Sequence, residues 1–330
     1  MIVTYYQRFP SEGYYSIEKI FREIQRALPN DIGYKVAISK YESRGVLKRI
    51  LNCIDAIFRQ GDINHITGDI HYVSLFLKKK RTIITIHDCG TLKRLRGLKK
   101  WIFYVFWYWL PEKRCKYITV VSEATKKELL KYLRCDEHKI RVIPNPIPKN
   151  YKYVPLNFNA KKPTILQVGT KPNKNLERVA EAINGISCEL IIIGKLMKYQ
   201  IRLLEKNNIQ YTSYENVADE DLIKFYIKSD IVVFASTYEG FGMPIIEAQA
   251  IGRPVITSNI SSMPEVAGNG ACLVDPYNID SIRNALIKII KDDDYRNNLI
   301  SNGLKNVERF RLEYIVNQYV ELYKDVCRER

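Results

Sequence analysis

The feature that most constrains the fold is an alternation of short β-branched runs with amphipathic stretches, which occurs twice along the chain. In the first half, residues 2–6, 82–86 and 117–121 have the composition of buried strands. Residues 16–28 and 123–133 place apolar side chains at the three- and four-residue spacing of helices. This alternation predicts parallel sheets with helices on both faces.

A proline-rich segment separates the two halves. Five prolines lie within residues 144–163, and proline disfavours helix, so residues 141–163 are predicted to be a linker. The pattern then restarts, with strands predicted at 164–168, 188–193, 230–234, 254–257 and 272–274, and helices at 175–183, 279–291, 293–308 and 312–328.

The chain length of 330 residues also favours two domains. We predict two Rossmann-like, doubly wound α/β domains, residues 1–155 and 156–311, with the terminal helix 312–330 packing back on the first. Because ligands of such sheets bind at the carboxyl ends of the strands, the ligand is expected in a cleft between the halves.

The basic charge is confined to one half of the chain. Residues 1–155 contain 30 Lys+Arg against 14 Asp+Glu, a net charge of +16, whereas residues 156–330 contain 22 of each. This asymmetry indicates an anionic partner for the first half, either a phosphorylated substrate, acidic lipid or nucleic acid. The alternative is a lineage bias towards lysine, which should not stop at mid-chain.

Two further features bear on the cellular compartment. The first ten residues do not have the pattern of a secretory signal peptide. The seven cysteines are scattered and none forms a CxxC pair, which favours reduced thiols in a cytosolic protein over disulfides or a zinc site.

The segment STYEGFGMPIIEAQAIGRPVIT places two carboxylates, Glu239 and Glu247, around a predicted helix start. Pro244 fits the first helical position, Glu247 would then lie in the first turn, and the free N–H groups there suit an anion. Gly240 and Gly242 allow close approach of the backbone to a ligand. Since a carboxylate can bind paired hydroxyls, the segment suggests a nucleotide sugar. The alternative is that Glu247 complements the helix dipole and Glu239 is solvated.

Several segments resemble one enzyme family in the same order. Residues 238–268 resemble the glutamate–seven residues–glutamate signature of the retaining, family-four (group 1) glycosyltransferases, which have the GT-B fold. Residues 165–183 resemble the donor-phosphate segment of that family, and residues 119–130 and 139–147 resemble the end of its first domain. The similarity covers nearly the whole chain and is weakest over residues 1–80.

The resemblance implies roles for the acidic segment. Glu247 corresponds to the glutamate that holds the ribose hydroxyls of the donor, and Glu239 to the glutamate that holds the transferred sugar. The backbone expected to meet the donor sugar and diphosphate is that of Gly240, Phe241, Gly242 and Met243.

The resemblance also assigns a phosphate segment. Gly169 and Thr170 end a strand, and Lys174 matches the phosphate-binding lysine of the family. A fixed cation there would stabilise the charge that develops on the leaving diphosphate. Many relatives have arginine where this chain has Thr170, and Lys171 is the candidate to replace it; the alternative for Lys171 is a solvated loop lysine.

In the first half, His87 and Asp88 follow a predicted buried strand. The resemblance implies that His87 faces the donor sugar, so His87 and Glu239 are the predicted catalytic residues. Asp69 and His71, together with Asp88, are candidates for acceptor binding, although capping within a loop explains Asp69 and His71 equally well. Gly13 is a candidate for the loop that approaches the diphosphate.

Residues 92–116 have the most unusual composition, with Lys and Arg flanking the apolar, aromatic run 101–110. This run is too short to cross a bilayer, so it either lies in a membrane interface or forms an ordinary buried helix. The residues predicted to contact an anionic membrane surface are Lys99, Lys100, Trp101 and Trp107.

Together these features predict a retaining GT-B hexosyltransferase that uses GDP-mannose or a UDP-sugar. The expected acceptor is a saccharide, including a lipid-linked one, in cell-envelope polysaccharide synthesis, and the expected location is cytoplasmic or peripheral on the inner face of the cytoplasmic membrane. No cofactor, metal or nucleic-acid partner is expected, and no side chain is an evident nucleophile, which favours front-face displacement. The alternatives are another GT-B enzyme, such as a nucleotide-sugar epimerase or a phosphorylase, and a non-catalytic binding or scaffold protein.

Overall fold

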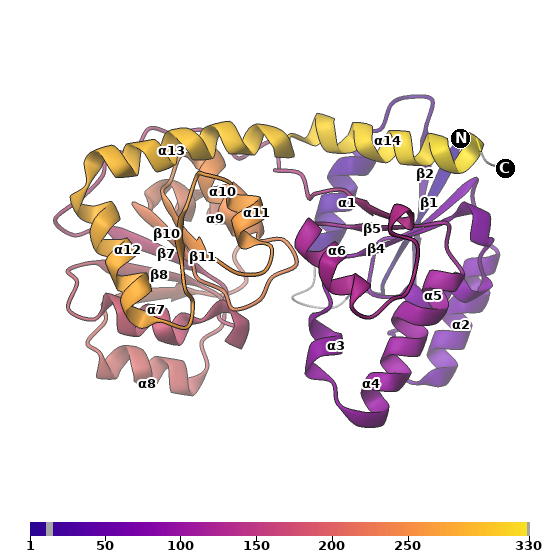
Figure 1. Ribbon diagram of the computed structural model, residues 1–330, viewed down its shortest axis with the longest axis horizontal. Coiled ribbons are helices and arrows are strands. Elements are labelled where there is room, and N and C mark those ends of the chain that lie inside the picture. The colour runs from indigo at the N-terminus through magenta and orange to yellow at the C-terminus, as the bar shows by residue number, and fades with distance from the viewer. Residues whose placement is uncertain (11–15, 329–330) are drawn as a thin grey trace. The chain divides into compact units, whose positions relative to one another are not determined.

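The computed structural model describes residues 1–10 and 16–328 (Figure 1). The chain forms two compact units, one made of Met1–Pro148 with Leu312–Arg330 and the other of Lys149–Arg311. The predicted boundary after residue 155 therefore lies within the second unit, because the segment from residue 149 onward packs there. Gly13 lies outside the described residues.

The first unit contains a six-stranded parallel sheet with the order β2-β1-β3-β4-β5-β6. Its strands are β1 (Ile2–Gln7), β2 (Gly33–Ile38), β3 (Ile63–Ile66), β4 (Thr82–Ile86), β5 (Tyr117–Val120) and β6 (Ile140–Val142). Its helices are α1 (Ser16–Arg26), α2 (Val46–Ile57), α3 (Gly90–Arg94), α4 (Gly97–Tyr104), α5 (Leu110–Lys113), α6 (Glu123–Leu130) and α14 (Leu312–Arg328). Short 3-10 helices are η1 (His71–Phe76), η2 (Lys79–Arg81) and η4 (Glu137–Lys139), and a π-helical turn, η3 (Val105–Trp109), joins α4 to α5.

The second unit repeats this arrangement, with the parallel strand order β12-β11-β10-β7-β8-β9. Its strands are β7 (Thr164–Val168), β8 (Glu189–Ile193), β9 (Tyr211–Tyr214), β10 (Ile231–Phe234), β11 (Val255–Ser258) and β12 (Cys272–Val274). Its helices are α7 (Leu176–Ile183), α8 (Lys198–Lys206), α9 (Asp219–Lys228), α10 (Met243–Ile251), α11 (Met263–Ala267), α12 (Ile279–Lys291) and α13 (Asp293–Val307), with 3-10 turns η5 (Pro172–Lys174) and η6 (Glu308–Phe310). Figure 1 shows α9, α10 and α11 on one side of this sheet and α7, α8 and α12 on the other.

The predicted doubly wound α/β architecture is thus confirmed in both units. Strands 82–86, 164–168 and 272–274 and helices 279–291 and 312–328 match the structure residue for residue. The predicted linker is wrong at its start, because Ile140–Val142 pairs with β5 and extends the first sheet. Among the described residues, no helix has the length and apolarity needed to span a bilayer.

Helix α14 packs on the first unit through a buried polar cluster. It lies beside α1 on one face of the sheet (Figure 1). Its Tyr319 and Tyr323 are fully buried. The Tyr323 hydroxyl is 2.9 Å from the Tyr5 hydroxyl and 2.8 Å from Nδ1 of His65. Burial lowers the pKa of His65 to about 3, so the imidazole is neutral and the cluster carries no charge at pH 7.

Removing the Tyr323 hydroxyl should therefore destabilise the first unit. Tyr323→Phe leaves polar atoms of Tyr5 and His65 buried without this partner, and we expect a loss of about 1–3 kcal/mol in the free energy of unfolding. Urea denaturation measures this loss. Tyr314→Phe, on the exposed side of the same helix, is the control and should unfold like the wild type. Equal stability of the two variants would contradict an energetic role for the cluster.

Candidate active site

The loop between β10 and α10 carries the two predicted carboxylates. Gly242 has φ 114°, and a Cβ there would lie 3.0 Å from the Ile245 side chain, so this position requires glycine. Helix α10 begins directly after it, at Met243. Pro244 is consequently the second helical residue, and Glu247 lies in the second turn. Two predictions are therefore wrong, because the helix begins one residue earlier than expected. Pro244 is not the first helical residue, and Glu247 is not in the first turn.

Glu239 and Lys174, which were predicted separately, form an ion pair. The Lys174 ammonium donates to Oε1 of Glu239 at 2.7 Å, and both side chains are mostly buried. The same lysine Nζ lies 4.5 Å from the ring centroid of Phe234, which ends β10. The structure therefore places the predicted phosphate-binding cation against the predicted sugar-binding carboxylate.

Asn173 joins this pair, although the sequence analysis assigned it no role. Its side-chain N–H group donates to Oε1 of Glu239 at 3.2 Å and to the carbonyl of Tyr238 at 3.0 Å. The local sequence KPNKN does not reveal that the Asn173 side chain bonds to Glu239, because the two residues are sixty-six positions apart. The 3-10 turn η5 brings both Asn173 and Lys174 to Glu239.

Two serines hold the backbone of the same loop. Ser261 Oγ donates to the carbonyl of Glu239 at 2.6 Å, and Ser262 Oγ donates to the carbonyl of Phe241 at 2.7 Å. Ser261 has φ 59°, a strained backbone conformation for a residue with a side chain. These hydroxyl groups fix the backbone around Gly240, and the sequence analysis missed them because serine pairs are common in loops.

The strand β7 delivers the remaining predicted phosphate residues. Gly169 has φ 94°, and a Cβ there would lie 2.9 Å from Cγ of Lys174, so the glycine leaves room for the lysine stem. Thr170 Oγ1 donates to the carbonyl of Lys195 at 2.6 Å. Lys171 is exposed at the start of η5.

Glu247 is held by a tyrosine from the neighbouring helix. The hydroxyl of Tyr226, on α9, donates to Oε2 of Glu247 at 2.7 Å. Glu247 is half-buried, whereas Tyr226 has no exposed surface. The sequence analysis did not single out Tyr226.

In the first unit, His87 and Asp88 follow β4 at the carboxyl edge of the sheet. Nε2 of His87 donates to the carbonyl of Thr67 at 3.0 Å, and burial lowers the pKa of His87, so the ring is neutral. Asp88 is exposed, and its carboxylate accepts from the backbone N–H of Gly90 at 2.6 Å at the start of α3. His87 remains a predicted catalytic residue and Asp88 a predicted acceptor residue.

Asp69 and His71 have different surroundings. Asp69 reaches solvent, yet protein packs densely around its carboxyl group, and this desolvation, followed by the nearby Asp88 carboxylate, raises the pKa of Asp69 to about 7. His71 is buried, and its Nδ1 donates to the carbonyl of Trp107 at 2.8 Å. Burial lowers the pKa of His71 to about 4. The prediction that His71 binds an acceptor is wrong, because its ring belongs to the core.

Trp107 is also a core residue, which contradicts its predicted contact with a membrane. Its indole N–H donates to the carbonyl of Asp69 at 3.2 Å, and its ring stacks on Phe103 at 4.9 Å. The π-helical turn η3 places Trp107 and Tyr108 consecutively inside the core. Trp101 and Lys99 are exposed, and the ammonium of Lys100 lies 5.7 Å from the ring centroid of Tyr132.

Comparisons with known proteins agree with this architecture. The family model described as Glycosyltransferase Family 4 matches residues 21–151, and the one described as Glycosyl transferases group 1 matches residues 152–306. The chain belongs to the family-four glycosyltransferases. The first match falls on the first unit and the second on the unit that contains the Lys174–Glu239 pair.

Two relatives of this chain are O-antigen chain mannosyltransferases by name. O-antigen chain mannosyltransferase B of Escherichia coli is 28% identical over 234 residues, which are 63% of this chain and 60% of the relative. O-antigen chain mannosyltransferase RfbU of Salmonella typhimurium is 31% identical over 218 residues, which are 62% of this chain and 60% of the relative. The alignments thus span less than two thirds of each relative.

The fold of this family-four chain is that of solved glycosyltransferases. The structure of Anabaena HepE in complex with UDP-glucose superimposes with a TM-score of 0.82 over 98% of this chain and 100% of that chain, at 14% identity. At such low identity the likeness shows the fold alone, which is GT-B.

Thr170, which the resemblance to the family places where an arginine is expected, joins neighbouring segments in the structure. Its hydroxyl group bridges to the loop after β8, and its carbonyl accepts from Nε2 of Gln200 at 2.9 Å. In the same loop, Lys174 pairs with Glu239, a predicted site residue.

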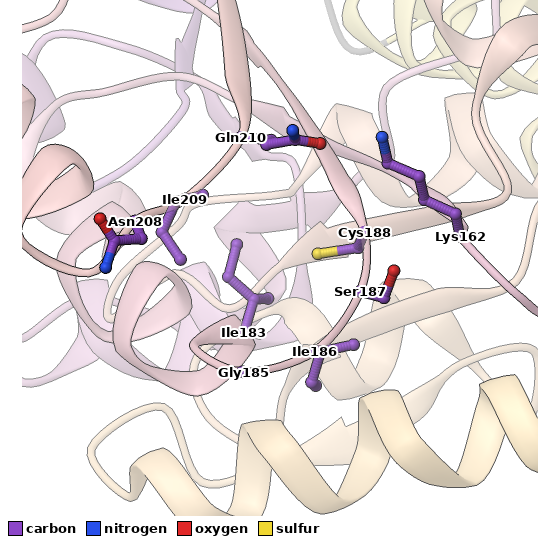
Figure 2. A pocket seen from close by; sticks show the side chains of 9 residues that line it. All are labelled: Lys162, Ile183, Gly185, Ile186, Ser187, Cys188, Asn208, Ile209 and Gln210. Carbon is purple, nitrogen blue, oxygen red and sulfur yellow. The ribbon is translucent and has the colours of Figure 1, made fainter.

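A pocket in the second unit lies away from these residues. It has a volume of about 420 Å³ and is lined by residues such as Cys188 and Gln210, which immediately precede β8 and β9 (Figure 2). The amino ends of the strands form this edge, whereas Gly169 and Glu239 follow the carboxyl ends of β7 and β10. Within residues 1–10 and 16–328, no group of three or more His, Cys, Asp or Glu side chains is placed to hold a metal.

Proposed function

We propose that the protein is a retaining hexosyltransferase that transfers a hexose from GDP-mannose or a UDP-sugar to a saccharide acceptor. The observation that carries the proposal is the Lys174–Glu239 ion pair in the loops of the second unit, in a chain of the family-four glycosyltransferases. The names of the two O-antigen mannosyltransferases support mannose and polysaccharide synthesis. The solved complex of HepE with UDP-glucose supports a nucleotide-sugar donor.

Different residues of the second unit would bind the diphosphate, the sugar and the ribose of the donor. The amino end of α10 would present the positive end of the helix dipole to the diphosphate. Lys174 would exchange its contact with Glu239 for a phosphate oxygen, which releases the carboxylate for sugar hydroxyls. Glu247 would accept hydrogen bonds from the ribose hydroxyls.

Retention follows from attack on the face that the leaving group occupies. The bond from the anomeric carbon to the phosphate oxygen breaks, and the acceptor oxygen bonds to that carbon on the same face. The departing phosphate takes the proton of the acceptor hydroxyl and carries the electron pair of the broken bond. Lys174 would stabilise this growing negative charge.

Incubation with UDP-, GDP- and ADP-sugars tests the function. We expect one nucleotide class to bind, and an oligosaccharide product with the anomeric configuration of the donor to form when an acceptor is added. Release of the nucleotide without an acceptor, together with a changed sugar, would indicate an epimerase. Lack of binding by every nucleotide sugar would overturn the proposal.

We also propose that the reaction needs no metal, because Lys174 and the helix end supply positive charge. Full activity is expected in excess EDTA, measured as nucleoside diphosphate released with the preferred donor and acceptor. A loss of activity that added Mg²⁺ or Mn²⁺ restores would contradict this prediction.

A further part of the proposal is a lipid-linked acceptor reached at an anionic membrane surface. Helix α4 with η3 exposes large apolar side chains, namely Leu98, Trp101, Ile102, Phe106 and Trp109. Helix α2 and the residue after it expose another set, namely Val46, Leu47, Ile50, Leu51, Ile54, Ile57 and Phe58. Basic side chains interleave with both sets, as at Lys48 and Lys99, and such a combination suits the interface of an anionic bilayer.

Reversing two of these charges should release the protein from vesicles. The double variant Lys99→Glu, Lys100→Glu replaces attraction to anionic lipid by repulsion, and we expect at least about a tenfold loss of binding, at roughly 1 kcal/mol per basic residue. Sedimentation with phosphatidylglycerol vesicles measures it. The control Lys161→Glu, Lys162→Glu makes the same charge change in an exposed loop of the second unit. Equal binding of the two double variants would contradict the membrane surface.

A further inference from the structure

The buried hydroxyl of Tyr226 makes a short hydrogen bond to the carboxylate of Glu247. Tyr226 lies on α9 and Glu247 on α10, and the hydroxyl donates to Oε2 at 2.7 Å. Tyr226 has no exposed surface, so its hydroxyl group cannot itself reach a ligand in solvent. Its effect on a ligand must therefore act through Glu247.

The surroundings of Tyr226 prevent the side chain from moving away. The ring of Tyr151 packs edge-on against its ring at a centroid distance of 5.8 Å. The buried Arg253 donates to the carbonyl of Tyr226 at 3.2 Å and to the carbonyl of Ile227 at 2.8 Å. Arg253 also donates to the carbonyl of Val154 at 2.8 Å. The end of α9, the end of α10 and residues 151–154 are thereby linked, and the tyrosine is rigid.

A rigid donor on one oxygen fixes the plane of the carboxylate. Two carboxylate oxygens offer about four acceptor positions, and the bond to Tyr226 uses one of them. Burial raises the pKa of Tyr226 well above its usual range, with the Glu247 carboxylate as the second cause, so the phenol stays protonated. Neighbouring ribose hydroxyls are bound best by a carboxylate that is already oriented, because no rotamer freedom is then lost on binding.

We infer that Tyr226 is a positioning residue that orients Glu247 for the ribose of the donor nucleotide and so sets the preference for ribonucleotides over 2′-deoxyribonucleotides. This inference rests on the proposed function, in which Glu247 binds the ribose. The new element is Tyr226, whose hydrogen bond would make Glu247 discriminate between ribose and 2′-deoxyribose.

Calorimetric titration of the full chain with GDP, UDP and their 2′-deoxy forms tests the inference. Tyr226→Phe keeps the ring and removes only the hydroxyl group, and we expect about fivefold to tenfold weaker binding of the ribonucleotide but less than about a twofold change for the deoxynucleotide. Tyr214→Phe, at a partly exposed tyrosine of the same unit, is the matched control and should leave both affinities unchanged.

A double-mutant cycle with Glu247→Gln separates positioning from a general effect on the fold. If Tyr226 acts through Glu247, the double variant should bind no more weakly than Glu247→Gln alone. Independent, additive losses would overturn the inference, as would an equal loss for the ribo and deoxy forms or wild-type affinity of Tyr226→Phe. Thermal unfolding of each variant shows whether the fold is retained. The single variant Glu247→Gln leaves the buried Tyr226 unchanged, so its affinities for the ribo and deoxy forms measure the contribution of the carboxylate alone.

The two proposals fail in different ways. If the wild type binds none of the nucleoside diphosphates, the donor site itself is refuted. If the wild type binds them with a ribose preference that Tyr226→Phe leaves unchanged, only the role of Tyr226 is refuted.

Discussion

Lys174→Met is expected to lower kcat/KM for the nucleotide-sugar donor by about 100-fold to 1,000-fold. The ammonium of Lys174 lies in the predicted phosphate loop, 2.7 Å from Oε1 of Glu239. Methionine keeps much of the apolar stem that packs beside Gly169 and removes the charge. Most of the loss should appear in kcat, because the charge on the diphosphate grows towards the transition state. Steady-state kinetics over a range of donor concentrations separates kcat from KM.

A control is needed because Lys174→Met also leaves Glu239 without its ion pair. The double variant Lys174→Met, Glu239→Gln removes the unpaired charge and should recover thermal stability but not activity. Lys174→Arg restores a cation and should regain part of kcat. A single variant within about threefold of wild-type kcat would remove Lys174 from the proposed mechanism.

Glu247→Ala is expected to raise the donor KM by about 10-fold to 100-fold with little change in kcat. Its carboxylate is proposed to bind ribose hydroxyls, and hydrogen bonds to a charged group contribute about 1.5–3 kcal/mol. These hydroxyls lie away from the reacting carbon, so their contribution should be similar in the ground state and the transition state. Initial rates at saturating acceptor give both constants.

Glu308→Ala is a suitable comparison, since this glutamate is solvent-exposed in η6 of the same unit. It should leave the donor KM unchanged. If Glu247→Ala instead lowers kcat at unchanged KM, the carboxylate acts on the chemical step and the assignment to ribose is wrong.

Buried strands with a continuous apolar run were predictable, whereas the buried strand β3 (Ile63–Ile66) was missed because Asn64 and His65 interrupt its apolar run. β4 (Thr82–Ile86) and β7 (Thr164–Val168) lie inside their sheets, covered on both faces. β2 (Gly33–Ile38) and β9 (Tyr211–Tyr214) were missed because they lie at sheet edges, where most of their side chains are exposed and polar residues interrupt the pattern. Helix α2 was missed because its apolar residues face solvent as well as the sheet.

The site was predictable where it rests on local sequence. A glycine-rich turn before a helix marks Gly242 and the neighbouring Glu239, whereas Lys174 was singled out only through the resemblance to the family. Contacts across the fold could not be derived in this way. The bond from Tyr226 to Glu247 depends on two helices packing together, and the burial of Trp107 depends on a π-helical turn that helical periodicity does not reveal.

The chain enters the second unit at residue 149 and returns to the first at residue 312. Tyr323 thus completes a polar cluster with Tyr5, a residue 318 positions earlier. During synthesis α1 can cover this face of the first sheet but α14 cannot, so part of the face stays exposed until the second unit has been translated. Nascent chains released before residues 312–328 emerge would expose that apolar face, and they would be the species that chaperones bind or proteases remove.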